Sequence, residues 1–454
     1  MADVISSNKV SGLESLASLP GLRKHQQYMD NILHEQQWTK TTHSSSIIDK
    51  LPAEILHYIL SFLSPHDLAR VSVTCRALEE HASNDLLWAR LVNSNLPFPI
   101  HDPGPFESFR RLYLAHLPYW FIPKNKIWFA DNEHTGNLIL ARYDNRRGVI
   151  EAYRLIADRG SPEFQVWEAH PDVMIQSFHP TVSLWLDDPV LLLKDLEPSE
   201  STSECQTWMA ERKMHMPAEA NHLFNSLLLC SNQDTHEQNQ LNLWPPPNIP
   251  SENRVVRSIL GADPSDPESW SEASQEAFRI RRWTNFRLMI SPGQNSAMIT
   301  YSTLDPDLYT PTREKPYQGV WVGDYSAHGC EFLLIIQGDP SDDNEGDSTT
   351  GTVQRGSLHA IKLTGDPNVP RGETTFISGD IGPKGLIKVE TEEPFKGSRI
   401  VRANGHVAGL GFHDDTYISS QLILVSTEYI AHYWQEMGHI SYYRRVDINN
   451  LLQI

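Results

Sequence analysis

A short polar stretch around residue 362 carries the densest set of side chains able to bind a ligand. Thr364, Gly365 and Asp366 offer a hydroxyl, a glycine that permits close approach and a carboxylate, and Lys362 adds a cation at the same strand parity as Thr364. A carboxylate favours an amide or another N–H donor, whereas a lysine favours a carboxylate. Both kinds of group are present here. Gly-Asp-Pro-Asn also forms turns by itself, so Asp366 has a second interpretation as the cap of its own turn.

A second set of reactive side chains is Tyr325, His328 and Glu331. In a regular strand, residues three apart point to opposite faces, so His328 and Glu331 meet only if a bulge forms at Gly329. We therefore expect His328 to line a cleft or support the fold. The alternative is a hydrolase that uses His328 and Glu331.

The sequence holds no further arrangement typical of an active site. Cys205, His215, His222 and Cys230 have no spacing known from zinc sites. GxSxG, Walker A, HExxH and GxGxxG motifs are absent. We predict no catalytic residue, no metal and no cofactor. Aromatic residues alternate along predicted strands and are expected in the core or lining a barrel: Trp321, Tyr429, Tyr433, Trp434, Tyr442 and Tyr443.

Net charge and cysteine spacing limit the kinds of partner and the cellular compartment that we expect. The 454 residues carry a net charge of -19, which disfavours nonspecific binding to nucleic acid or anionic membrane. The four cysteines lie far apart without a CxxC pair, as in reducing compartments. No signal peptide or membrane span is recognisable. We expect a cytoplasmic or nuclear protein that binds neither nucleic acid nor membrane.

The sequence of residues 51–91 predicts three short helices that share an apolar face. Pro52 suits a helix start, and apolar residues then recur at helical spacing up to Leu63. Ser64 is the expected N-cap of the next helix, with Pro65 at its first position. About 40 residues bury too little surface to be stable alone, so a partner is expected to cover the remaining apolar face.

The rest of the chain has the pattern of an α+β protein. We expect a disordered tail over 1–45, the helical domain over 46–96, a linker helix within 97–126 and an antiparallel β-barrel over 127–454. The strand blocks on either side of residues 196–283 are expected to share one barrel, with that segment as a helical insertion. The acidic loop 339–351 is expected to be mobile.

The helical stretch resembles a known family. Its residues LPAEIL, ILSFL, DLARVSVTCRAL and LLW are similar to the F-box, which docks substrate receptors on the Skp adaptor of cullin-based ubiquitin ligases. The resemblance implies contact with the adaptor, and through it with the cullin. The residues predicted to make that contact are Leu51, Pro52, Glu54, Ile55, Leu56, Ile59, Leu60, Leu68, Leu86 and Trp88.

Three blocks in the second half resemble the cyclin-D-binding F-box-only receptors. They are QGVWVGDYSAHGCE from residue 318, KLTGDPNVP from residue 362 and NGHVAGLGF from residue 404. The resemblance implies a β-barrel that takes the C-terminal segment of a client protein into its cleft. The residues predicted to bind the client are Trp321, Tyr325, His328, Lys362, Thr364, Gly365 and Asp366.

The function predicted from both resemblances is that of a non-catalytic substrate receptor that presents clients for ubiquitination and proteasomal degradation. The alternative is an F-box protein outside a ligase, whose barrel binds a small apolar ligand.

Overall fold

The computed structural model describes residues 47–132, 135–161, 163–194, 211–217, 222–232, 244–245, 267, 272–284, 296–339 and 354–453. The chain divides into two compact units, which we take one at a time. We call residues 47–87 the helical unit, and residues 88–196 with 209–454 the β unit. The predicted tail 1–45 and all but Asp339 of the acidic loop lie outside the described residues.

The helical unit contains more helices than the three predicted. It comprises α2 (Ile47–Lys50), α3 (Ala53–Leu60), α4 (Pro65–Ser72), α5 (Arg76–Ala82) and the start of α6 (Asp85–Asn93). Ser64 is the N-cap of α4, as expected: its hydroxyl accepts a hydrogen bond from the Asp67 backbone N–H at 3.1 Å. Leu56, Leu60 and Leu68 form the buried side of these helices.

The β unit begins with short helices that follow the Pro-rich connector. The predicted linker helix is α7 (Phe109–Ala115), with Ser108 as its N-cap, and α8 (Phe121–Asn125) leads into the first strand. Trp120 donates its indole N–H to the Tyr113 carbonyl at 2.9 Å, which ties the two helices together. Among the described residues, no helix has the length and apolar character needed to cross a membrane.

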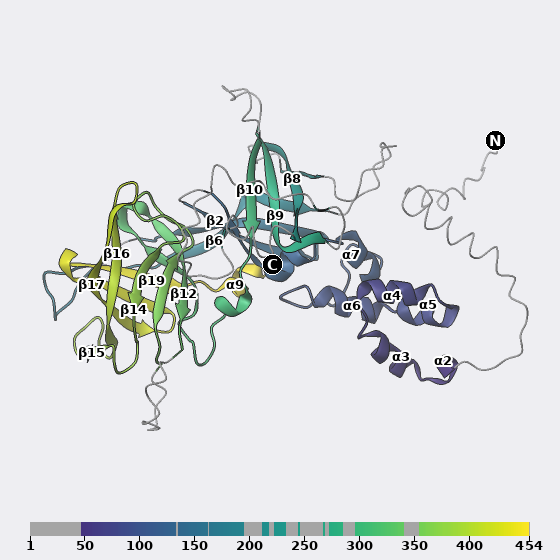
Figure 1. The fold of residues 1–454 in the computed structure, drawn as a ribbon, viewed down its shortest axis with the longest axis horizontal. Coiled ribbons are helices and arrows are strands. Elements are labelled where there is room, and N and C mark those ends of the chain that lie inside the picture. Colours follow the sequence, from purple (N-terminus) through teal and green to yellow (C-terminus); the bar gives the residue numbers. More distant parts are fainter. Residues whose placement is uncertain are drawn as a thin grey trace, which may run out of the picture. The chain divides into compact units, whose positions relative to one another are not determined.

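The first of the two sheets in the β unit has eight strands (Figure 1). Its order is β6-β3-β2-β1-β10-β9-β8-β7. The bounds are β1 (Ile127–Ala130), β2 (Asn137–Asp144), β3 (Val149–Asp158), β6 (Thr181–Leu193), β7 (Arg212–His215), β8 (His222–Ser231), β9 (Ala273–Thr284) and β10 (Ser296–Ser302).

The prediction of a helical insertion over 196–283 is wrong for the described part of that segment. β7, β8 and β9 are strands there and pair antiparallel with one another and with β10. In β9, Phe278 and Ile280 alternate with Arg279 and Arg281, which is the period of a strand. The prediction of a charged helix in this segment overlooks the alternation.

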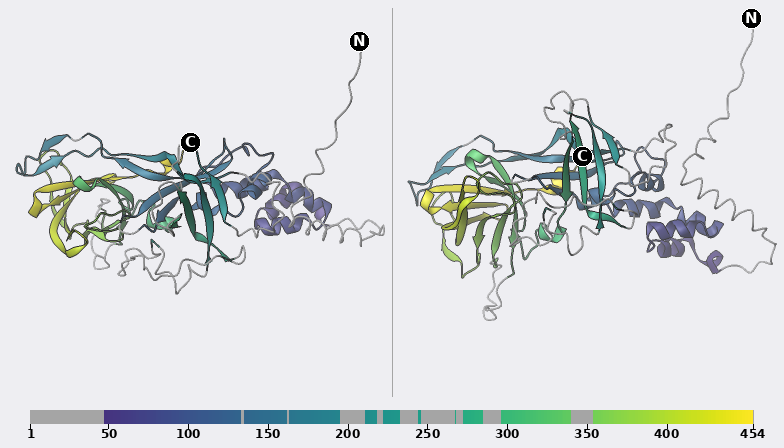
Figure 2. Two further views of the ribbon diagram at one scale, coloured as in Figure 1. Left: turned by 90° about the horizontal axis from the view of Figure 1, so that it is seen from above. Right: turned by 45° about the horizontal axis from the view of Figure 1, so that its top comes forward.

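The second sheet closes into a barrel. Eight antiparallel strands follow one another in space, and β11 pairs with β19 to complete the ring. They are β11 (Gly319–Asp324), β12 (Cys330–Gln337), β13 (Leu358–Lys362), β14 (Thr374–Ser378), β16 (Arg399–Gly409), β17 (His413–Ser426), β18 (Tyr429–Trp434) and β19 (His439–Arg445). Both views in Figure 2 show these green and yellow strands curving round a common axis. The predicted antiparallel barrel is thus confirmed.

Three short strands extend the barrel sheet. β15 (Leu386–Val389) pairs with β16, and the hairpin of β4 (Phe164–Val166) and β5 (Met174–Gln176) joins the edge of β19 through one parallel bridge. The main strands of the first block, β1, β2, β3 and β6, belong to the eight-stranded sheet, so the prediction of one shared barrel is wrong. A common core instead joins the two sheets: Phe129 and Leu140 of the first pack in one cluster with Val322 and Ile440 of the second.

Candidate functional site

The three sequence blocks that resemble the cyclin-D-binding receptors converge at one end of the barrel. The Phe332 N–H of β12 donates to the Thr364 hydroxyl at 2.8 Å, which joins the first block to the second. The Asn368 amide donates to the Ala408 carbonyl at 3.0 Å, and the Gly411 N–H donates to the Pro367 carbonyl at 2.8 Å. These two bonds join the second block to the β16–β17 hairpin. Residues about 80 positions apart in sequence thereby form one polar end of the barrel.

Lys362 is the centre of this end. Its ammonium group lies 2.5 Å from an Asp366 carboxylate oxygen and 2.7 Å from a Glu331 carboxylate oxygen, and all three side chains are buried. The same nitrogen lies 4.2 Å from the centroid of the Tyr325 ring, within cation–π range. Lys362 is therefore already surrounded by two acids and a ring. Glu331 was not among the predicted binding residues.

Asp366 serves both of the roles weighed from the sequence. One carboxylate oxygen contacts Lys362, and the other accepts the backbone N–H groups of Asn368 at 2.6 Å and Val369 at 2.8 Å. The turn Gly-Asp-Pro-Asn is thus capped by the same carboxylate that pairs with the lysine. Gly365 fixes the loop from its other side by donating its N–H to the Thr135 carbonyl at 2.9 Å.

The two carboxyl groups at this end of the barrel differ in their protonation. Burial raises the pKa of Glu331 to about 8, with Lys362 opposing the shift and Asp366 adding to it. Burial also acts to raise the pKa of Asp366, but Lys362 and hydrogen bonds outweigh it and hold that pKa at about 2. At neutral pH the cluster is therefore a lysine cation, an aspartate anion and a largely protonated glutamic acid, with a net charge near zero.

The structure separates His328 from Glu331. His328 ends a 3-10 turn (Ser326–His328) and is exposed, whereas Glu331 points into the barrel. Tyr325 remains partly exposed at the rim and shares a hydrogen bond with the Thr375 hydroxyl at 2.8 Å. No hydrogen bond or ion pair between His328 and Glu331 occurs in the described chain, so no acid–base pair is assembled there.

Trp321 lies deeper, in the packed interior of the barrel. It is fully buried, and its indole N–H donates to the Tyr317 carbonyl at 3.0 Å. Leu333, Phe376 and Tyr443 fill the same cluster. At the polar end Gly405 is required by packing, since a Cβ there would lie 2.2 Å from the Trp434 ring. Trp321 thus supports the wall of the barrel and is not exposed to a client.

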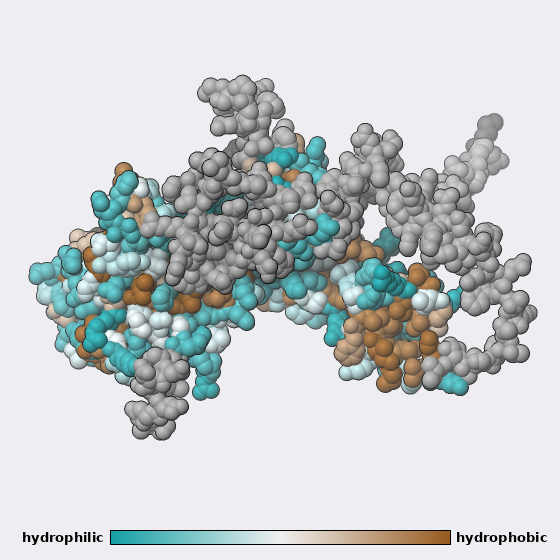
Figure 3. All heavy atoms as spheres, viewed as in Figure 1, coloured by the Kyte–Doolittle hydropathy of each residue, from teal (hydrophilic) through white to brown (hydrophobic). Residues whose placement is uncertain are grey.

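The helical unit offers a surface of the opposite kind. Ile55, Tyr58, Ile59 and Phe62 follow one another at i, i+3, i+4 and i+7, and the four side chains are about half to two-thirds exposed. Leu86, at 77% exposed, and Val73 are further large apolar side chains open to solvent in this unit. On the face drawn in Figure 3, brown atoms gather over the helices. We call these six residues the apolar stripe.

The residues predicted to contact an adaptor fall into an exposed group and a buried group. Pro52, Glu54, Ile55, Ile59 and Leu86 are exposed and Leu51 is partly exposed, but Leu56, Leu60, Leu68 and Trp88 are buried. The last four support the helices and have little side-chain surface to offer. Tyr58, Phe62 and Val73 were missed by our sequence reasoning, although the helical spacing of Tyr58 and Phe62 with Ile55 would have indicated them.

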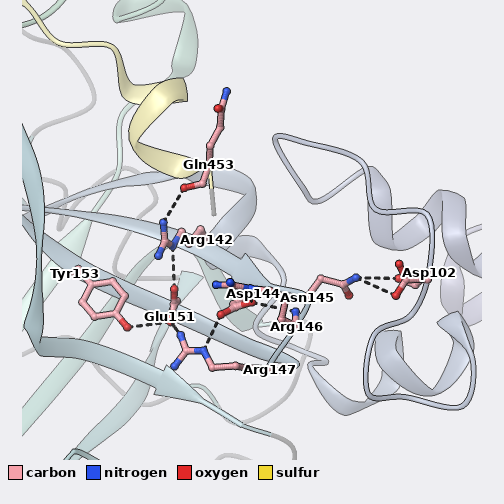
Figure 4. Close-up of polar contacts among 9 residues, drawn as sticks. All are labelled: Asp102, Arg142, Asp144, Asn145, Arg146, Arg147, Glu151, Tyr153 and Gln453. Carbon is pink, nitrogen blue, oxygen red and sulfur yellow. Dashed lines mark hydrogen bonds and ion pairs between the residues drawn. The ribbon is translucent and has the colours of Figure 1, made fainter.

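A polar network anchors the connector and the C-terminal segment to the β2–β3 hairpin (Figure 4). The Asn145 amide donates to Asp102 of the connector at 3.2 Å, and the Arg142 guanidinium contacts both Glu151 at 2.9 Å and the Gln453 carbonyl at 3.1 Å. Gly148 leaves space for Pro105, because a Cβ there would lie 2.6 Å from its ring. The connector therefore has fixed contacts within the β unit.

The described residues contain no group of three or more histidine, cysteine, aspartate or glutamate side chains placed to hold a metal. Of the formal zinc set, Cys205 lies outside the described residues. Cys75 and Cys330 are free thiols.

Comparisons with known proteins agree with this architecture. An F-box-like domain matches residues 48–94, and a Cyclin D1 binding domain matches residues 301–450. F-box only protein 4 of Bos taurus is 40% identical over 53 residues, which are 12% of this chain. Protein EXECUTER 2, chloroplastic, of Arabidopsis thaliana is 32% identical over 92 residues, or 20% of this chain. Each match spans 14% of the relative's length.

The two domain matches fall where the structure places the helices with the apolar stripe and the barrel with its polar end. The chain therefore carries an F-box-like domain and a match to a Cyclin D1 binding domain, and it resembles the cyclin-D-binding F-box receptors.

Proposed function

We propose that this chain is the non-catalytic substrate-recognition subunit of a Skp–cullin–F-box ubiquitin ligase. The helical unit docks on the Skp adaptor, which connects the chain to the cullin. The polar end of the barrel binds the C-terminal segment of a client protein, which is then ubiquitinated and degraded by the proteasome. The cytoplasm and the nucleus are the compartments in which this activity is expected.

The apolar stripe supports the docking step. Six large apolar side chains on a unit this small leave it with an exposed apolar surface that favours burial against a partner. Each fully buried side chain of this size contributes about 1.5–3 kcal/mol of transfer free energy. An adaptor groove that covers Ile55, Ile59 and Phe62 would gain most of its affinity from these contacts.

The convergence of the three blocks around Lys362 carries the client-binding step. Tyr325 and His328 remain accessible at the rim, and Leu410 of the β16–β17 hairpin is 74% exposed beside the Pro367 loop. An extended chain end that reaches this rim meets apolar, aromatic and polar side chains within one loop cluster. Trp321, Thr364 and Gly365 act indirectly here, by holding the wall and the loop in place.

The charge state of the cluster favours a particular end group. Lys362 already pairs with Asp366 and Glu331, so a client carboxylate would have to compete with two acids for one cation. An uncharged end group avoids this repulsion. We therefore propose that the site prefers a neutral C-terminal group, such as a carboxamide, over a free carboxylate.

The alternative of a small apolar ligand inside the barrel has less support. Trp321, Leu333, Phe376 and Tyr443 are fully buried against one another in the interior, where such a ligand would have to lie.

Peptide binding to the purified chain tests the client-binding step. A set of peptides that are identical except for a carboxamide, a carboxylate or a one-residue extension at the C-terminus is titrated by fluorescence anisotropy. We expect the carboxamide to bind most tightly and Asp366→Asn to weaken it at least tenfold. Equal affinities for all three end groups, in a protein whose unfolding is unchanged, would remove the end-reading proposal.

A further inference from the structure

Two arginines and one aspartate form an ion cluster in the eight-stranded sheet, away from the barrel. The Asp188 carboxylate of β6 receives Arg154 of β3 at 2.6 Å and Arg282 of β9 at 3.3 Å, and both distances end on the same oxygen, Oδ2. Each of these side chains keeps only a fifth to a quarter of its surface exposed. Two arginines thus share one carboxylate oxygen in a partly dehydrated place.

The unused donors of Arg282 form one edge of its guanidinium group. Nη1 faces Asp188, while Nε and Nη2 are buried and have no hydrogen-bond partner among the described residues. Nε–H and Nη2–H point in parallel and are the pair that binds two oxygens of a carboxylate or phosphate side by side. The Nε–H of Arg154 is also buried without a partner.

Such an arrangement is costly unless an anion completes it. A buried donor without a partner destabilises the folded state, and more so when the group is charged. Arginine keeps its charge at every physiological pH, so the cluster does not relieve the imbalance by losing a proton. The neighbouring Tyr301 stays neutral, because burial raises its pKa to about 12; Arg282 and Arg154 act to lower that pKa, and Asp131 and Asp188 act to raise it.

The surroundings suit a ligand that arrives from solvent. The Arg154 guanidinium lies 4.4 Å from the centroid of the Trp185 ring, which is itself 41% exposed. An aromatic ring stacked on an arginine holds the guanidinium plane in place while leaving its N–H edge available. Asn225, paired with Arg282 across β8 and β9, is fully buried beside the cluster.

We propose that Arg282, assisted by Arg154, forms an oxyanion-binding site for a phosphate or carboxylate group. The ligand's two oxygens accept the Nε–H and Nη2–H of Arg282, and its charge balances the second arginine. The site lies in a different sheet from the polar end of the barrel and does not depend on the proposed client-binding role. Its occupant is either a free anion or an acidic or phosphorylated side chain of a bound protein.

Thermal unfolding of the full-length chain tests the site. Sodium phosphate and sodium acetate are each titrated against sodium chloride at equal ionic strength, because a ligand that binds only the folded state raises Tm with concentration. We expect at least one of the two anions to raise Tm beyond chloride. Arg282→Gln should raise the apparent Kd of that anion at least tenfold. Arg282→Lys keeps the charge but removes the two-donor edge, so it should weaken binding as well.

The control is Arg281→Gln, which removes the same charge one residue away but breaks a pair with Glu211 at 2.6 Å on the other face of β9. This variant should retain the response to the anion. A response that is the same in wild type, Arg282→Gln and Arg282→Lys would overturn the proposal, as would the absence of any response beyond chloride. Should Arg282→Gln fail to fold, Arg282→Lys alone decides.

A second arm identifies the source of the anion. Short blocked peptides that contain serine, phosphoserine or glutamate at one position are added to the same chain. Displacement of phosphate by the phosphoserine or glutamate peptide assigns the site to a protein ligand, whereas displacement by neither assigns it to a free anion. Either result supports the site only if Arg282→Lys weakens the binding in question.

Discussion

The helical unit and the polar end of the barrel present their binding residues in opposite ways. The apolar stripe is exposed, and side chains such as Ile59 and Phe62 keep about half or more of their surface open to solvent. At the barrel end, Lys362, Asp366 and Glu331 are buried and hold one another. The stripe can therefore be altered without unfolding the protein, whereas the barrel end combines recognition with stability.

The largest effect is expected from removing the cation at the barrel end. Lys362→Met leaves Asp366 as a buried carboxylate without its counter-ion, which costs about 3–5 kcal/mol in comparable buried pairs. Urea unfolding measures the loss. Lys315→Met is the matched control, because Lys315 pairs with Asp339 at 2.8 Å and Asp339 is 81% exposed, so about 1 kcal/mol or less is expected. Equal losses in both variants would contradict the role given to Lys362.

The next largest effect is expected on adaptor binding, from substitutions in the apolar stripe that should leave the stability of the fold unchanged. Ile55→Asp combined with Ile59→Asp places two charges in the surface proposed to meet the adaptor, so affinity for a Skp adaptor should fall at least 100-fold, or about 2.8 kcal/mol. Glu80→Lys, an exposed position on α5, serves as the control. Co-purification and titration with the adaptor measure the change. Adaptor binding that survives the double substitution in a folded protein would show that the stripe is not the docking surface.

The pH dependence of stability tests the protonation of Glu331. Its folded pKa of about 8 lies above the usual value for glutamate, so the folded state holds an extra proton between about pH 4.5 and 8. The stabilisation is present below that range and is lost as the pH rises through 8. Glu331→Gln stays neutral, so relative to wild type it should gain at least about 1 kcal/mol between pH 5 and 9. A constant difference between the two unfolding curves would place the pKa of Glu331 in its ordinary range.

The smallest effect is expected at a helix cap in the helical unit. Ser64→Ala removes the acceptor of the Asp67 N–H and should cost about 1 kcal/mol in the unfolding of that unit. Ser61→Ala removes a hydroxyl that donates to the Tyr58 carbonyl and caps no helix N-terminus, so it should cost less. Circular dichroism during thermal unfolding compares the two. A larger loss in Ser61→Ala would argue against Ser64 as the cap.

Local signals in the sequence predicted much of this fold. The N-cap at Ser64, the linker helix and the later barrel strands depend on nearby residues, and each was predictable from short patterns. The eight-stranded sheet was missed because β1 pairs with β10, about 170 positions away, and no short window contains that pairing. The same limit hid the distribution of the two strand blocks between two sheets.

The candidate site was predictable in its members but not in its contacts. Lys362, Asp366 and Tyr325 do meet, yet Glu331 joins them only because β12 lies beside β13. Leu56 and Trp88 match the F-box pattern, but only the fold shows that they are buried. No pattern in the sequence indicated Arg282. Its role follows from the contact of Nη1 with Asp188, which leaves Nε and Nη2 without a hydrogen-bond partner among the described residues.

One capture experiment tests the central claim that this chain connects an adaptor to a client end. Skp adaptor is immobilised, and retention of a labelled peptide with a neutral C-terminus is measured with and without the chain. We predict that wild type retains the peptide, and that Ile55→Asp with Ile59→Asp abolishes retention although the peptide still binds that variant in solution. Retention by the double variant, or failure of wild type to retain the peptide while it binds the adaptor, would contradict the account.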